Sequence, residues 1–145
     1  MTLDEVTKHI QACAKLMNEH YGRVVFDEWA VVSLRRHDPR VLSYRGPRSD
    51  DFLKNFVTDL GGLRADLLNS KYQAGDFEFS HQGVGTGIEA FLVLGNGAYL
   101  ICNNTQASMT DIVRDPRWLA AQVPFAELSD RVRNSPLRVG EPAAC

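Results

Sequence analysis

The stretch IEAFLVLGNGAYLICN, residues 88–103, decides the fold. Two apolar runs in it flank the dipeptide Asn96-Gly97. Asparagine and glycine both tolerate positive φ, so this dipeptide between apolar runs is typical of a tight β-hairpin. The stretch therefore predicts two neighbouring antiparallel strands.

A glycine-rich segment, HQGVGTG (residues 81–87), precedes this hairpin. A phosphate-binding loop needs a strand before the glycines and a helix after them, because the helix N-terminus holds the anion. Here a strand follows Gly87, and no Lys-Ser or Lys-Thr pair is present to reach a phosphate. The segment with Gly83, Gly85 and Gly87 therefore predicts a connection between strands, and we expect no nucleotide to bind there.

Three more strands are expected. Residues 24–34, VVFDEWAVVSL, are dense in β-branched and aromatic side chains. Residues 35–40, RRHDPR, contain the turn signal Asp38-Pro39 and lead into a return strand at 41–44. Residues 76–81, DFEFSH, alternate apolar and polar side chains, the pattern of a sheet with one solvated face.

Three helical segments complete the pattern. Residues 3–20 carry an apolar stripe between an N-cap at Thr2 and a C-cap at Gly22. Residues 49–69 form a second helix, bent at a glycine pair. The C-terminal third is expected to be helical but broken, with a restart at Asp115-Pro116 and another break or kink at Pro124.

The order is helix, two strands, helix, three strands, helix. It predicts an α+β fold with a five-stranded, largely antiparallel sheet and flanking helices. We expect residues 1–134 to form a single domain and residues 135–145 a flexible tail without hydrophobic period.

Composition narrows the class of protein. A chain of 145 residues with 44% hydrophobic and 23% charged residues is typical of one globular domain. The net charge of -2 gives no reason to expect nucleic acid or an anionic membrane as a partner. No apolar run approaches the roughly 20 residues of a membrane span. The N-terminus lacks a signal-peptide pattern, and three widely spaced cysteines suggest no disulfide framework, so we expect a cytoplasmic protein.

Residues with catalytic or metal-binding chemistry form no convincing set. His9 and Cys13 share a helix face, with His20 further along, but two ligands on one helix make no tetrahedral site. His81 and Cys102 are candidates for a base and a nucleophile. Cys102 lies in an apolar strand without a nearby cation, so a core thiol is the preferred interpretation. We expect no enzyme activity, no cofactor and no metal.

One basic cluster stands out around the first hairpin. It is a candidate binding patch for an acidic partner or phosphate, and it consists of Arg35, Arg36, Arg40, Arg45 and Arg48. The preferred alternative is a solvated turn, since turns attract charge and Tyr44 is its only aromatic neighbour.

The order of these elements resembles the roadblock / dynein light-chain family, which has a profilin-like fold. The resemblance is carried by the FDEWAVVSL and RVLSY hairpin, the DDFLKNFVTDLGGLRADLL helix and the FLVLGNGAYLICNN hairpin. The chain departs from the family at Pro116 and Pro124, which break the final helix, and in a longer first hairpin loop. The resemblance implies a non-enzymatic homodimer, with two sheets joined at an edge and two long helices side by side, that serves small GTPases or motor complexes.

The expected second helix has apolar residues on more than one side, more than one sheet face needs. Its surplus predicts a dimer interface at Leu53, Phe56, Val57 and Leu60, with Phe56 turned toward the sheet. Two alternatives stay open. One is a sensing module that binds a small molecule between sheet and helix, and the other is a small hydrolase that uses His81 and Cys102.

Overall fold

The computed structural model describes residues 1–35, 38–47, 71–79, 90–107 and 109–138. The elements in these ranges are α1 (Leu3–Tyr21), β1 (Glu28–Arg35), β2 (Asp38–Arg45), β3 (Phe77–Phe79), β4 (Ala90–Gly95), β5 (Ala98–Asn103), α4 (Met109–Arg114) and α5 (Trp118–Asn134). The helix expected at residues 49–69 lies outside them.

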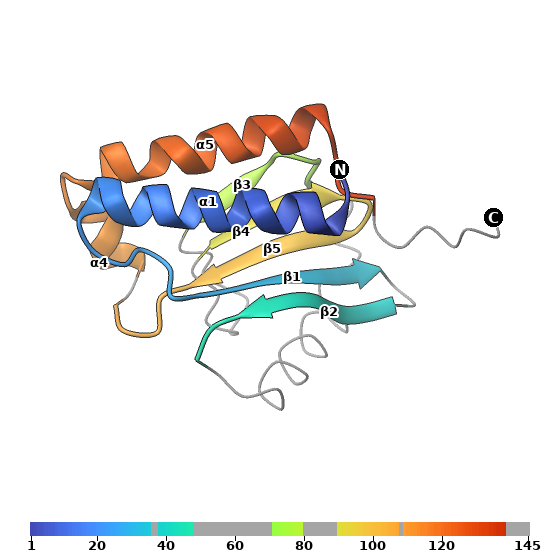
Figure 1. Ribbon diagram of the computed structural model, residues 1–145, viewed down its shortest axis with the longest axis horizontal. Helices are drawn as coiled ribbons and strands as arrows, with labels where there is room; N and C mark the ends of the chain where they lie inside the picture. The colour runs from blue at the N-terminus through green and yellow to red at the C-terminus, as the bar shows by residue number, and fades with distance from the viewer. Residues whose placement is uncertain (36–37, 48–70, 80–89, 108, 139–145) are drawn as a thin grey trace.

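The described strands form one sheet in the order β2-β1-β5-β4-β3 (Figure 1). Every neighbouring pair is antiparallel. The expected α+β class with a five-stranded antiparallel sheet is confirmed.

The β4–β5 connection is the tight turn that the sequence predicts. Asn96 has φ 55° and Gly97 has φ 80°, the positive values that asparagine and glycine tolerate. The turn brings Gly95 opposite Ala98 after a register shift between Val93 and Gly95. The turn lies at the same end of the sheet as the last residues of β1, since Ser33 is opposite Ala98 and the Leu34 amide donates to the Gly97 carbonyl.

The first hairpin differs from the expectation of a long turn over residues 35–40. Asp38 and Pro39 belong to β2, with Pro39 opposite Leu34, so only residues 36 and 37 separate the strands. Proline is compatible with a strand at the edge of a sheet, because one side of such a strand needs no ladder donor. The longer loop expected from the turn signal is therefore wrong.

Helices α1 and α5 lie side by side on one face of the sheet (Figure 1). The hydroxyl of Thr2 accepts a hydrogen bond from the Glu5 amide, which caps the start of α1. Gly22 ends the helix at φ 81°, with its N–H donated to the Asn18 carbonyl. Both expected caps of the first helix are confirmed.

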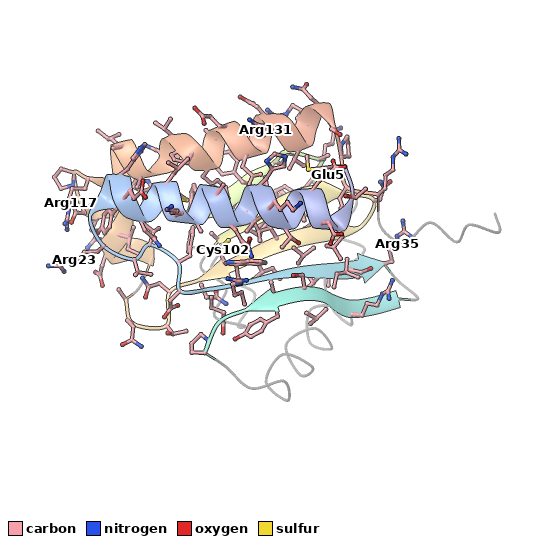
Figure 2. All side chains as sticks on the ribbon, viewed as in Figure 1. Glu5, Arg23, Arg35, Cys102, Arg117 and Arg131 are labelled. Atoms are coloured by element: carbon pink, nitrogen blue, oxygen red, sulfur yellow. The ribbon has the colours of Figure 1, made fainter. Side chains whose placement is uncertain are left out.

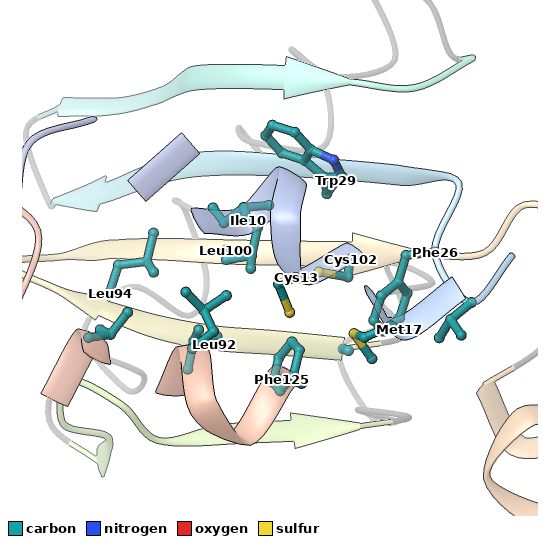
Figure 3. Packing of buried hydrophobic residues seen from close by; sticks show 14 of the residues in the cluster. Ile10, Cys13, Met17, Phe26, Trp29, Leu92, Leu94, Leu100, Cys102 and Phe125 are labelled. Carbon is teal, nitrogen blue, oxygen red and sulfur yellow. The ribbon is translucent and has the colours of Figure 1, made fainter. Parts of the chain in front are cut away.

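Apolar side chains fill the layer between these helices and the sheet. Figure 2 shows the side chains on the ribbon, and Figure 3 shows this core from close by. The residues labelled there are Ile10, Cys13, Met17, Phe26, Trp29, Leu92, Leu94, Leu100, Cys102 and Phe125. The opposite face of the sheet is also apolar and buried, with Ala30, Val32, Leu34, Phe91, Val93, Tyr99 and Ile101. The central strands are thus buried on both faces.

Helix α5 runs unbroken through Pro124, so the expected break there is wrong. A proline inside a helix leaves the carbonyl four residues earlier without its helical donor. In this chain that carbonyl, of Ala120, receives a hydrogen bond from α1 instead. The interruption at Asp115-Pro116 is confirmed, since α4 ends at Arg114 and α5 begins at Trp118. The expected cap, with Asp115 at the N-cap and Pro116 as the first helical residue, is wrong, because Arg117 holds the N-cap position.

The segment after α5 differs from the expected flexible tail over its first four residues. Leu137 is 1% exposed, and its N–H donates to the Leu94 carbonyl. The Arg138 amide donates to the Met1 carbonyl at 2.8 Å. This segment therefore packs against the domain, and residues 139–145 lie outside the description.

None of the described helices combines the length and apolar character that a membrane crossing requires.

Candidate functional site

An open hollow of about 710 Å³ lies at the end of the sheet that the β4–β5 turn forms. Segments far apart in the sequence meet there: the end of β1, the loop before β3, the turn itself and the segment after α5. The residues that line it are Arg35, Tyr72, Gln73, Ala74, Val93, Gly95, Asn96, Gly97, Tyr99 and Pro136.

The β4–β5 turn positions Arg35 at this hollow. The Nε of Arg35 donates to the main-chain oxygen of Asn96 at 2.9 Å. A Cβ on Gly97 would stand 2.8 Å from the Cγ of Arg35, so a glycine lets the arginine stem cross the turn. Fixing Nε in this way leaves the two terminal amino groups of the guanidinium for another acceptor. No carboxylate in the described part of the chain pairs with Arg35.

Two tyrosines give the hollow an aromatic lining. The Tyr72 ring meets the ring of Phe91 edge to face at 5.1 Å, and its hydroxyl donates to Glu78 at 2.9 Å. Tyr99 is 2% exposed, and burial, followed by the neighbouring Tyr72, raises its pKa to about 12. Burial also raises the pKa of Tyr72. Both phenols therefore stay neutral around pH 7, and the partly exposed Tyr72 ring offers apolar surface.

Arg35 is the one charged residue among the described lining. Gln73 and Asn96 add amides, although the Asn96 side chain is already committed to the Leu137 carbonyl at 2.7 Å. The lining thus combines a cation, a few polar groups and aromatic or aliphatic walls. This combination of groups is typical of binding sites, and the described lining supplies no nucleophile.

A buried carboxylate lies on the sheet far from the hollow. Glu28, at the start of β1, is 3% exposed. Its Oε1 accepts from Asn103 Nδ2 at 3.0 Å, and its Oε2 accepts from the Tyr44 hydroxyl at 2.9 Å. These hydrogen bonds satisfy the buried carboxyl group and tie β1 to both neighbouring strands. The sequence offers one signal for it, an acid within an apolar strand.

The described arginines of the predicted basic patch lie at two different ends of the β1–β2 pair. Arg35 lies at the end of β1, and Arg40 is opposite Ser33, two residues away along that strand. Arg45 is opposite Trp29, at the other end of the β1–β2 pair. About 3.3 Å per residue separates successive strand positions, so Arg45 is roughly 17 Å from Arg40 along β2. Arg36 and Arg48 lie outside the described residues.

The described cysteines are both free and buried. Burial, with a smaller effect of Glu127, raises the pKa of Cys13 to about 12. Burial, with a smaller effect of Cys13, raises the pKa of Cys102 well above its usual value. A protonated buried thiol is a poor nucleophile. Cys102 thus packs in the core as expected, while His81 lies outside the description.

The histidines of α1 have structural surroundings. His9 lines a small cavity of about 110 Å³ between α1 and α5, together with Cys13 and Leu16. His20 contacts the main chain of α5. Within the described ranges, no three histidine, cysteine or acidic residues come together in a group that could hold a metal.

The remaining predicted sites fall on residues that the structure does not describe. They are the interface residues Leu53, Phe56, Val57 and Leu60, and the glycines Gly83, Gly85 and Gly87. Sequence reasoning did not single out Tyr72, Tyr99 or Pro136. They carry no motif, and only the folded chain brings them to Arg35.

No family model matches this chain, and no curated protein or solved structure matches it either. The resemblance to the roadblock / dynein light-chain family therefore rests on element order and hydrophobic pattern, and it stays a prediction.

Proposed function

We propose that the chain is a non-enzymatic dimeric scaffold of roadblock type that works with a small GTPase or another protein. The element order supports the proposal, since the described strands form one antiparallel sheet with α1 and α5 on one face. The same resemblance implies a dimer in which two sheets join at an edge. Such a dimer needs an edge strand with apolar surface that a second copy can cover.

The observation that carries the proposal is the exposed aromatic surface at β3, the last strand of the sheet. The Phe77 ring packs edge to face on Phe79 at 5.4 Å and on Phe125 at 5.2 Å. Phe77 nevertheless remains 37% exposed. Aromatic residues are enriched in protein interfaces because they bury a large apolar area at little cost in side-chain entropy. A second copy at this edge would cover that ring.

The chemistry of the described residues favours binding over catalysis. Cys13 and Cys102 are protonated core thiols, and Glu28 is held by structural donors. Free cysteines in the core also suit a reducing compartment, so we place the scaffold in the cytoplasm.

Sedimentation velocity on the full chain tests the dimer. We expect the unmodified protein to sediment as a dimer, and Leu53→Glu to shift it to monomer because two like charges would meet in an apolar contact. Phe77→Ser should weaken the same dimer. Leu119→Glu is the matched control, because Leu119 is already 72% exposed on α5 and is not among the residues named for the interface.

A monomer at high concentration would remove the main support of the scaffold proposal. Loss of the dimer in Leu119→Glu as well as in Leu53→Glu would place the interface elsewhere. Circular dichroism on each variant separates loss of the dimer from loss of the fold.

The second candidate function is a module that senses a small molecule. The hollow beside Arg35 favours it, since its volume falls within the roughly 300–1,000 Å³ of small-molecule sites. The position of this hollow differs from the expected one between the sheet and a helix. The hollow lies at the end of the sheet, next to Pro136 in the segment that follows α5.

A further inference from the structure

We propose that the hollow at the β4–β5 turn binds a small organic anion, with the oxyanion head on Arg35 and an apolar body against Tyr72 and Pro136. The inference rests on the second candidate function and specifies its ligand class. It is independent of whether the chain forms a dimer.

The guanidinium group of Arg35 is the group in the hollow that would bind an anion. Its Nε is fixed by the Asn96 carbonyl, while the described residues offer no carboxylate to its terminal amino groups. An arginine held at one nitrogen loses less side-chain entropy when it binds a ligand. Its planar donors match the oxygens of a carboxylate or phosphate, and such charge-assisted hydrogen bonds are about twice as strong as neutral ones.

The β4–β5 turn holds the Arg35 side chain in place. Gly97 has φ 80°, and a side chain there would meet the Arg35 stem at 2.8 Å. The Asn96 side chain binds the Leu137 carbonyl, which anchors the turn to the segment after α5. Asn96 in this turn thus contacts both Arg35, through its main-chain oxygen, and Leu137, through its side chain.

The walls of the hollow contain aromatic and aliphatic side chains. Among the lining residues, the partly exposed Tyr72 and the exposed Pro136 present ring surface to the hollow. Val93 and Tyr99 also line it but are nearly covered, at 4% and 2% exposed. The Tyr72 ring is itself fixed by Phe91 and by its hydrogen bond to Glu78. A flat apolar body would gain contact with these side chains, while a fully polar anion such as inorganic phosphate would not.

The charge of the lining decides the sign of the ligand. Arg35 is the only ionised group in the described lining, because the phenol pKa values of Tyr72 and Tyr99 are raised. An organic cation would meet a like charge and find no carboxylate among the described lining residues. A neutral ligand would fit the walls but leave the guanidinium without a charged partner.

Three matched probes test this inference on the full chain: 1-naphthoate, 1-naphthyl phosphate and the neutral 1-naphthamide. Each is titrated while the amide resonances of Gly95, Asn96 and Gly97 are followed by NMR. We expect at least one anionic probe to shift these resonances saturably and to bind about tenfold more tightly than naphthamide. The ratio between the two anions shows whether the head group is a carboxylate or a phosphate.

Arg35→Gln removes the charge and keeps a long polar side chain, so it should abolish the preference for the anions. Arg23→Gln is the matched control, because Arg23 is exposed at the opposite end of the molecule (Figure 2) and should leave the preference intact. Probes that bind the hollow with equal affinity whether charged or neutral would overturn the anion inference alone. Absence of any saturable shift would overturn both this inference and the sensing function. An equal loss in Arg23→Gln and Arg35→Gln would show a nonspecific charge effect and would also overturn the inference.

Discussion

The Nδ1 of His20 donates a hydrogen bond across 3.1 Å to the main-chain oxygen of Ala120, the carbonyl that Pro124 leaves without a helical donor. The imidazole replaces a missing backbone N–H and comes from another helix. This contact explains how α5 continues through a proline, and it joins α1 to α5 at the same time.

A double-mutant cycle tests this relationship. His20→Ala should lower the free energy of unfolding by up to about 1 kcal/mol, because the Ala120 carbonyl loses its donor. Pro124→Ala supplies a backbone N–H to the same carbonyl, so His20→Ala should cost less in that background. We expect a coupling of at least about 0.5 kcal/mol from urea unfolding. Glu19→Ala, exposed on the same helix, is the control and should show no coupling.

The hydrogen bonds of Asp115 at the α4–α5 junction predict that the stability of the fold depends on pH. The Arg117 side chain donates to its carboxylate from Nε at 3.0 Å and from Nη2 at 2.6 Å, and the Arg117 amide donates at 2.9 Å. These hydrogen bonds, helped by the Tyr21 hydroxyl, hold the pKa of Asp115 well below its usual value. A lowered folded-state pKa stabilises the fold above the unfolded value of about 4, and that stability is lost as the pH falls further.

Asp115→Asn should therefore destabilise the protein most at pH 7, and the difference should begin to shrink as the pH falls from about 4 to 2.5 toward the lowered folded-state pKa. Urea midpoints for the variant and the unmodified chain across this range provide the measurement. Asp130→Asn serves as the control for a lost surface carboxylate, since the Asp130 side chain is 73% exposed. A difference between Asp115→Asn and the unmodified chain that stays constant with pH would contradict the linkage.

The core thiols should resist alkylation in the native state. In a Cys145→Ser background, iodoacetamide at pH 8 should leave Cys13 and Cys102 unmodified by mass spectrometry, because burial raises the pKa of both. Both should react once the chain is unfolded in urea. Cys102→Ala should cost about 1 kcal/mol as a small core truncation. Rapid native alkylation of Cys102, with the fold retained, would revive the nucleophile hypothesis.

The elements that could be predicted from the sequence are those specified by neighbouring residues. Asn96-Gly97 requires positive φ, Thr2 and Gly22 cap a helix locally, and strand alternation depends on adjacent side chains. These signals need no knowledge of the rest of the chain, and the structure confirms the turn and both caps. The alternation expected over residues 76–81 is not borne out in β3, where Phe77 is 37% exposed.

The features that sequence reasoning missed depend on distant parts of the chain. Pro39 is compatible with a strand only because β2 is at the sheet edge, and edge position is a property of the whole topology. Pro124 lies inside a helix whose unpaired Ala120 carbonyl receives its donor from His20, on another helix. The hollow likewise needs Arg35, Tyr72 and Pro136 together, although no spacing between them signals a site.

The segment after α5 supplies the last prediction. Leu137 is 1% exposed and is tied to Leu94 by its main-chain amide, although the local sequence has no hydrophobic period. Leu137→Ala should lower the free energy of unfolding by about 3 kcal/mol, because it removes buried methyl groups and leaves a cavity. Leu119→Ala makes the same chemical change at a position that is 72% exposed, so it should stay within about 0.5 kcal/mol. Equal effects of the two variants in urea unfolding would mean that this segment contributes no core packing, and that the tail begins at Ser135 after all.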